Sequence, residues 1–161
     1  MAHIHTLPGQ VDNTADVFIV DTTSKTVLLR IHDKHKIWLH VGGHVELDET
    51  PEQAAIREVK EEVGLEIELW RDYAHNETFP EEDGQTKVLP PYQMNIHPVG
   101  DDHRHLSYIY YAKAITISIS EGETEKSDGI KWWTKAELEQ TTEVRKETKW
   151  YALDALDKLC N

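Results

Sequence analysis

The chain is poor in several residue types that define whole classes of protein. It has one cysteine in 161 residues, Cys160, so neither an intramolecular disulfide framework nor a cysteine-based zinc site can form. A reducing compartment, the cytoplasm, is the location expected by default. No apolar run approaches the roughly 18 residues that a membrane-spanning helix needs, so no membrane partner is expected. Residues 1–10 lack the basic and then apolar pattern of a secretory signal.

Positive charge is also scarce. Lys and Arg number 17 against 30 Asp and Glu, which gives a formal net charge of −13 with His neutral. A field of that sign repels polyanions, so binding to long nucleic acid is not expected. A small phosphorylated substrate remains compatible with it if a divalent cation bridges the acidic protein and the acidic ligand. The simpler interpretation is an acidic surface that serves solubility alone.

Apolar and β-branched segments alternate with turn residues along the whole chain. No repeat and no low-complexity linker divides it, so residues 1–161 are expected to form a single domain, with residues 1–12 as a loosely ordered N-terminal extension. Helices are predicted over residues 51–63, 135–140 and 143–159. Strands are predicted over residues 15–20, 26–31, 37–39, 65–70, 94–99, 105–119 and 130–133. Residues 76–91 form an irregular excursion between two of these strands.

The helix over residues 51–63 has the clearest boundaries. Thr50 offers an N-cap hydroxyl, Pro51 occupies the first helical position, and Gly64 follows as a stop. At about 100° per residue, four apolar side chains share one arc and are expected to face the core. They are Ala55, Ile56, Val59 and Val63.

Three carboxylates follow one another on the adjoining arc of that helix. Glu58, Glu61 and Glu62 are spaced i, i+3 and i+4, with no Lys or Arg on their own arc. Like charges at this spacing destabilise a helix by a few tenths of a kcal/mol per pair. A hard divalent cation is the natural compensation, because Mg²⁺ takes oxygen ligands. The alternative is an ordinary solvated acidic face.

The surrounding sequence favours the metal. Residues 43–65 read GHVELDETPEQAAIREVKEEVGL, which resembles the Nudix box, G-x5-E-x7-R-E-U-x-E-E-x-G-U, where U is aliphatic. The segments 38–43 and 130–138 resemble the strand that leads into the box and the strand and helix that close such a domain. One departure is His40-Val41, where many members carry Leu-Pro. The fixed positions are Gly43, Glu49, Arg57, Glu58, Val59, Glu61, Glu62, Gly64 and Leu65.

The resemblance implies an α/β/α sandwich with a mixed sheet and a metal-dependent hydrolase. Such an enzyme cleaves the pyrophosphate bond of a nucleoside diphosphate linked to another moiety. Glu58, Glu61 and Glu62 would hold Mg²⁺ or Mn²⁺, with a backbone carbonyl near Gly42 or Gly43. The cations would neutralise the pyrophosphate and lower the pKa of an attacking water. The glycines would let the backbone approach the metal and the phosphates.

The resemblance also implies roles for the remaining residues of the box. Arg57 and Glu49 are assigned to a salt bridge that rigidifies the loop and the helix. Glu61 is preferred as general base, with Asp128 and Glu125 as the alternatives on a later loop. The catalytic set is therefore Glu61, Glu58 and Arg57.

Several points stay open. His97, His103 and His105 could contact phosphate, act as an acid near neutral pH, bind a metal or form a polar strand end. A nucleotide-binding module without catalysis and an isoprenoid-diphosphate isomerase are the alternative functions on this fold. The class of nucleotide is undecided, residues 76–102 are expected to carry specificity, and pairing of two copies as a homodimer is left open.

Overall fold

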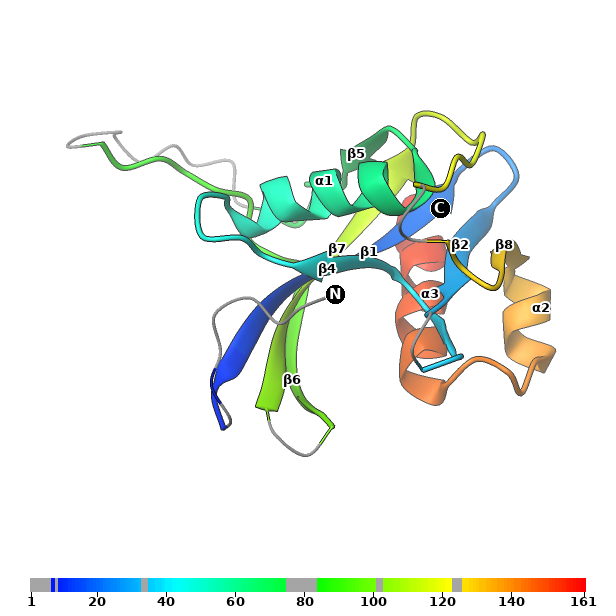
Figure 1. Cartoon of the computed structure of the whole chain (residues 1–161). Coiled ribbons are helices and arrows are strands. Elements are labelled where there is room, and N and C mark those ends of the chain that lie inside the picture. Colours follow the sequence, from blue (N-terminus) through cyan, green and yellow to red (C-terminus); the bar gives the residue numbers. More distant parts are fainter. Residues whose placement is uncertain (1–6, 8, 33–34, 75–83, 101–102, 123–125) are drawn as a thin grey trace.

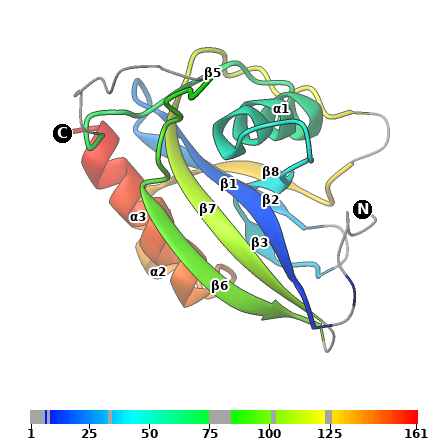
Figure 2. The same cartoon turned by 90° about the vertical axis from the view of Figure 1, so that its left-hand side faces the viewer.

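The computed structural model describes residues 7, 9–32, 35–74, 84–100, 103–122 and 126–161. Within them, eight strands form one mixed sheet that is covered by helices on both faces (Figures 1 and 2). Helix α1 packs on one face, and α2 and α3 pack on the other. The predicted α/β/α sandwich is confirmed. None of the helices in these ranges is long and apolar enough to cross a bilayer.

The elements follow the sequence closely in order and bounds. The helices are α1 (Pro51–Val63), α2 (Lys135–Gln140) and α3 (Lys146–Leu159). The strands are β1 (Val11–Asp21), β2 (Thr26–Ile31), β3 (Trp38–Leu39), β4 (Val41–His44), β5 (Ile67–Leu69), β6 (Gln93–Val99), β7 (His103–Ala114) and β8 (Ile130–Thr134). Strand β4 is missing from the prediction, and most of the strand bounds differ from it by one residue or more. The largest differences are three. Strand β7 ends at Ala114 rather than at residue 119, α3 begins at Lys146, and residues 11 and 12 belong to the sheet rather than to an extension.

Strand β1 organises the sheet. Along one edge it pairs in parallel with β7, from Val11 opposite Arg104 to Val20 opposite Lys113. Its other edge is shared by two strands: β4 pairs with residues 14–17 and β2 with residues 19–21, both antiparallel. The partner therefore changes at residue 18, and Gly42 and Gly43 of β4 lie beside the middle of β1.

Alternation along β1 sends its side chains into two separate cores. Ala15, Val17 and Ile19 pack with α1, and Phe18 and Val20 pack with α3. On the α3 side, the residues of β1 that precede Phe18 are polar, and so are the residues of β7 that precede Ile109. The hydroxyls of Thr14 and Ser107, both buried, form a hydrogen bond of 2.9 Å. This polar strip consists of Asp12, Thr14 and Asp16 on β1 and His103, His105 and Ser107 on β7.

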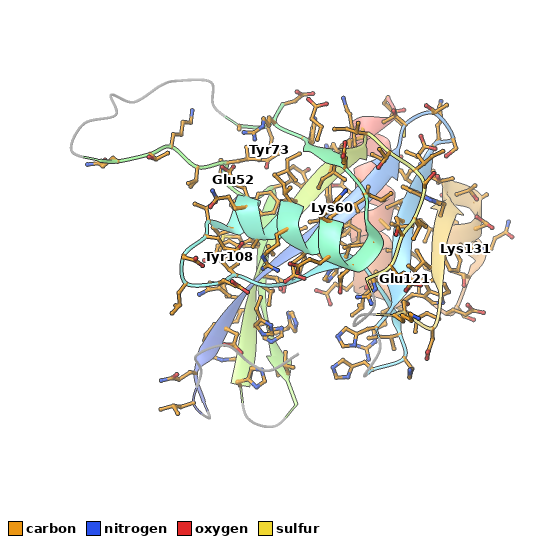
Figure 3. All side chains as sticks on the ribbon, turned by 45° about the horizontal axis from the view of Figure 1, so that its top comes forward. Glu52, Lys60, Tyr73, Tyr108, Glu121 and Lys131 are labelled. Carbon is orange, nitrogen blue, oxygen red and sulfur yellow. The ribbon has the colours of Figure 1, made fainter. Side chains whose placement is uncertain are left out.

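Local signals at both ends fix α1. The Thr50 hydroxyl accepts a hydrogen bond from the Gln53 N–H, the Gln53 side chain reciprocates, and Gly64 closes the helix at φ 69°. Figure 3 shows Glu52 and Lys60 toward its two ends. One expectation for its core stripe is wrong, because Ile56 is 47% exposed. The helix is turned so that Glu58 and Glu62 lie within its buried face, which moves Ile56 outward.

Candidate active site

The two glycines of β4 let the strand pass very close to β1 and α1. Gly42 has φ 147°, and a Cβ there would lie 2.1 Å from the carbonyl oxygen of Ala15. A Cβ on Gly43 would lie 2.5 Å from Oε1 of Glu58, whose residue is only 1% exposed. Any side chain at Gly43 would therefore displace the Glu58 carboxylate. The glycines were predicted to let the backbone approach the metal and the phosphates. In the structure they also make room for the buried Glu58 carboxylate and for the backbone of β1.

Glu62 is the second buried acid, and the backbone and a strand residue hold it. Its Oε2 accepts a hydrogen bond of 3.0 Å from the N–H of Gly42. Its Oε1 forms an ion pair with Arg30 of β2, which is itself buried. Sequence reasoning missed Arg30. The available signal was a single cation inside the apolar run of β2, since a buried charge requires a partner.

Arg57 links the loop before α1 to the acids on it. It donates to both carboxylate oxygens of Glu49, at 3.1 and 2.7 Å, and to the carbonyl of His44 at 3.0 Å. This is the salt bridge that the resemblance implied. Its Nη1 also donates to Oε1 of Glu58 and to Oε2 of Glu61, both at 2.9 Å. One guanidinium thus brings two of the three box carboxylates together.

These contacts set the protonation of the pair. The hydrogen bonds to Glu49, and then those to Glu58, raise the pKa of Arg57 well above its ordinary value. Burial acts to raise the pKa of Glu49, but the hydrogen bonds from Arg57 outweigh it and hold that pKa below its ordinary value. Both groups are therefore charged at neutral pH.

The three box glutamates differ in environment. Glu58 and Glu62 are buried, whereas the Glu61 side chain is 55% exposed and contacts Arg57. From the sequence, a metal ion was the expected compensation for the repulsion between these carboxylates. In the structure, Arg57 pairs with Glu58 and Arg30 pairs with Glu62, and these ion pairs offset part of that repulsion. Carboxylate oxygens beside a backbone that carries no side chain match the donor set of Mg²⁺ and Mn²⁺. The residues present therefore fit such an ion.

The candidates on the later loop are placed differently. Asp128 lies in an exposed segment and forms an ion pair with Lys36, near the start of β8, and the described residues give it no contact with α1. Glu125 lies outside the described residues.

A cavity of about 390 Å³ opens on the α3 side of the sheet. Apolar parts of its wall come from Phe18 of β1, Ile109 of β7 and Tyr151 of α3. Asn95 and His97 of β6 add polar groups, and His97 Nδ1 lies 2.9 Å from Asn95 Oδ1. Figure 2 shows β6, β7 and α3 side by side at this face. The part of the predicted specificity segment that the structure describes thus contributes a wall of the cavity.

The three histidines whose role the sequence left open lie together, and His44 of β4 lies beside them. The ring of His105 is 5.6 Å from that of His97, 5.3 Å from that of His103 and 5.1 Å from that of His44. Burial lowers the pKa of His105 to about 4, and the neighbouring imidazoles add to the effect. His105 is therefore neutral at pH 7.

Comparison with known proteins identifies the family. The family model described as the NUDIX domain matches residues 12–154, nearly the whole chain. The matches support a Nudix-type pyrophosphatase. The chain belongs to the Nudix family.

Individual relatives extend the comparison. A crystal structure of a NUDIX family hydrolase from Clostridium perfringens is 34% identical, with a TM-score of 0.83 over 92% of this chain and 97% of that one. The dihydroneopterin triphosphate diphosphatase of Haemophilus influenzae is 39% identical over 61 residues, which span 36% of this chain and 39% of that protein. The E. coli dihydroneopterin triphosphate pyrophosphohydrolase shares the fold, with a TM-score of 0.59 at 20% identity over 91% of this chain and 92% of that one.

Proposed function

We propose that the chain is a divalent-metal-dependent hydrolase that cleaves the pyrophosphate linkage of a nucleoside diphosphate derivative. The observation that carries this proposal is the pair of buried acids, Glu58 and Glu62, held against Gly42 and Gly43 of β4. Burying two carboxylates is costly, and a hydrolase that handles a polyphosphate needs this donor set. The substrate is a small molecule, and the single cysteine suits an enzyme of a reducing compartment, the cytoplasm.

Glu58, Glu61 and Glu62 would hold Mg²⁺ or Mn²⁺. When bound, such an ion neutralises charge on the pyrophosphate and lowers the pKa of an attacking water. Arg57 holds the carboxylates of Glu58 and Glu61 next to each other through one shared nitrogen. Arg30 and the N–H of Gly42 hold the carboxylate of Glu62 in place.

Glu61 is the proposed general base. Its carboxylate is the most exposed of the three, so a water molecule can reach it, and Arg57 fixes its position. Glu61 takes a proton from the water as the water oxygen forms a bond to one phosphorus and the bridging P–O bond breaks. The second phosphate leaves with the electron pair of that bond. Asp128 is less suited to this role because it pairs with Lys36, away from α1, and no described contact joins it to the acids of that helix.

The cavity on the α3 side is the proposed site for the ring of the substrate. Its aromatic walls include Phe18 and Tyr151, whose ring centroids are 5.5 Å apart. Asp16 and Asn95 offer a carboxylate and an amide to the polar edge of a flat heterocycle. A bicyclic purine or pterin ring suits this lining, and the two similar proteins named for dihydroneopterin triphosphate make that compound the first to test.

The test separates the products formed from dihydroneopterin triphosphate, GTP and ADP-ribose, with Mg²⁺, with Mn²⁺ and with chelator: phosphate or pyrophosphate from the two triphosphates, and AMP with ribose 5-phosphate from ADP-ribose. We expect metal-dependent cleavage, and a fall in kcat of at least about 100-fold in Glu58→Gln and in Glu62→Gln. Glu139→Gln on the exposed side of α2 is the matched control and retains the wild-type rate. Thermal melts accompany each variant, because Glu62→Gln leaves Arg30 without its charged partner.

Three results would contradict the proposal. Turnover that persists in chelator would show that the reaction needs no metal. A wild-type rate in folded Glu58→Gln would show that the acids of α1 take no part in the reaction. Tight nucleotide binding without turnover in any metal would favour the nucleotide-binding module instead.

A further inference from the structure

A second group of metal-ligating side chains lies where β1 and β7 begin, and it shares no residue with the acids of α1. In the parallel pairing of these strands, Asp12 stands opposite His105. His103 is two residues earlier on β7, so both imidazoles project from the same face of the sheet as Asp12. Strand register therefore brings two imidazoles and one carboxylate together.

The ligand atoms are close enough to share one ion. One ligand atom each from Asp12, His103 and His105 can be chosen so that all three lie within 4.8 Å of one another. Nε2 of His103 is 3.5 Å from Oδ2 of Asp12. In a tetrahedral site with metal–ligand bonds of about 2.1 Å, neighbouring ligand atoms are about 3.4 Å apart. The separation of His103 from Asp12 matches that spacing.

The cluster is largely shielded from solvent. Asp12 is 3% exposed, and His103 and His105 are partly buried. Nε2 of His44 also approaches Oδ2 of Asp12, at 3.7 Å, so this one carboxylate oxygen lies at the centre of the cluster.

We propose that Asp12, His103 and His105 form a binding site for a divalent transition-metal ion of the Zn²⁺ type. Two imidazoles with one carboxylate suit Zn²⁺, Co²⁺ or Ni²⁺, whereas Mg²⁺ prefers a set of oxygen ligands. Three protein ligands leave a further coordination position open. The site stands independently of the proposed hydrolysis, since none of its ligands belongs to the Nudix box.

Binding has a structural consequence that can be measured. The ligands come from two strands far apart in sequence, so an ion between them joins β1 to the start of β7. An ion that binds only the folded state raises its stability. Zn²⁺ is therefore expected to raise the Tm of the wild-type chain.

The test uses the full chain, freed of metal with chelator and then titrated with Co²⁺. We expect one equivalent to bind and to produce visible ligand-field absorption, and Zn²⁺ to displace it. Asp12→Asn, which keeps the shape of the side chain, and the double variant His103→Gln/His105→Gln should each weaken binding by more than about 100-fold. Circular dichroism shows whether each variant is folded. If the double histidine variant is unfolded, the test rests on Asp12→Asn.

Two sets of controls locate the ion. The double variant Glu58→Gln/Glu62→Gln should keep its Co²⁺ spectrum, which separates this site from the acids of α1. His3→Gln/His5→Gln and His32→Gln/His35→Gln remove the other histidine pairs of the chain and should leave the spectrum intact. The proposal is overturned if the wild-type chain shows no spectrum, or if the spectrum disappears with the glutamate variants or with either of these histidine pairs.

Discussion

At the scale of single residues, the close contact between Gly43 and Glu58 is the most sensitive point of the site. The carboxylate occupies the space that any Cβ at residue 43 would need. Gly43→Ala should therefore displace Glu58, lower kcat by at least about 100-fold and cost about 1–3 kcal/mol of unfolding free energy. Steady-state kinetics and urea denaturation measure the two effects.

A second substitution tests whether the clash is the cause. In Gly43→Ala/Glu58→Ala the colliding carboxylate is gone, so the urea midpoint should recover relative to Gly43→Ala while activity stays lost. A double variant less stable than Gly43→Ala would show that the clash with Glu58 is not the cause of the lost stability, and would point instead to the backbone of β4.

Much of the site could be predicted from neighbours in sequence, and the remainder depends on contacts across the fold. Glu49 lies just before α1 and Arg57 lies in its second turn, so their pairing follows from the box pattern. Arg30 reaches Glu62 from a strand 32 residues away, which no local pattern reports. The burial of Glu58 and Glu62 and the exposure of Glu61 depend on the rotation of α1 about its axis, and packing against β4 and β1 decides that rotation.

At the scale of elements, α2 shows how one exposed acid stabilises a helix start. Glu137 accepts a hydrogen bond from the backbone N–H of Thr134, receives one from the Thr134 hydroxyl, and pairs with Lys131 at 2.9 Å. The backbone bond, then Lys131 and the hydroxyl, lower the pKa of Glu137 to about 2. The stabilising contribution is therefore complete above the ordinary pKa of about 4.5 and is lost as pH falls from there to about 2.

This predicts a pH-dependent difference between the wild-type chain and Glu137→Gln. Glutamine preserves the capping geometry but carries no charge. Urea midpoints should favour the wild-type chain at pH 6, and the difference should shrink at pH 3. Parallel curves across this range would show that the charge of Glu137 contributes nothing to α2.

The end of an element could be predicted where a local capping motif sets it. It could not be predicted where pairing with a neighbouring strand sets it. Helices α1 and α2 begin at threonine capping boxes, and both match their predicted bounds. Residues 115–119 are rich in isoleucine and were expected to continue β7. The strand ends at Ala114 because its neighbours end there: Ala114 is paired with Ile67 of β5, and β1 last pairs at Lys113. Arg145 gives α3 no side-chain cap, so its start was misplaced.

At the scale of the whole molecule, the net charge of −13 opposes folding through self-repulsion. The screening length falls from about 30 Å at 10 mM salt to less than 10 Å at 200 mM, so the Tm should rise between these NaCl concentrations. Scanning fluorimetry or calorimetry measures the change. A Tm that falls with salt would mean that the surface ion pairs outweigh the repulsion.

The proposed binding of Mg²⁺ to the folded acids of α1 predicts a further rise in Tm at matched ionic strength. At 100-fold above its Kd, the added stability of about 2.7 kcal/mol corresponds to a shift on the order of 5 °C. Glu58→Gln/Glu62→Gln should show the NaCl effect alone. An equal Mg²⁺ shift in that variant would indicate nonspecific screening.

Because side chains alternate along β1, its two faces contribute to different parts of the molecule. Odd-numbered residues support the helix that carries the acids, and even-numbered residues line the cavity and the histidine cluster. Substitutions at positions of one parity leave the other face untouched. Substitutions at Asp16, Phe18 and their partners on β6 and β7 can therefore change which ring the proposed cavity binds, while the acids of α1 stay as they are. A one-residue insertion in β1 would exchange the two faces and abolish both at once.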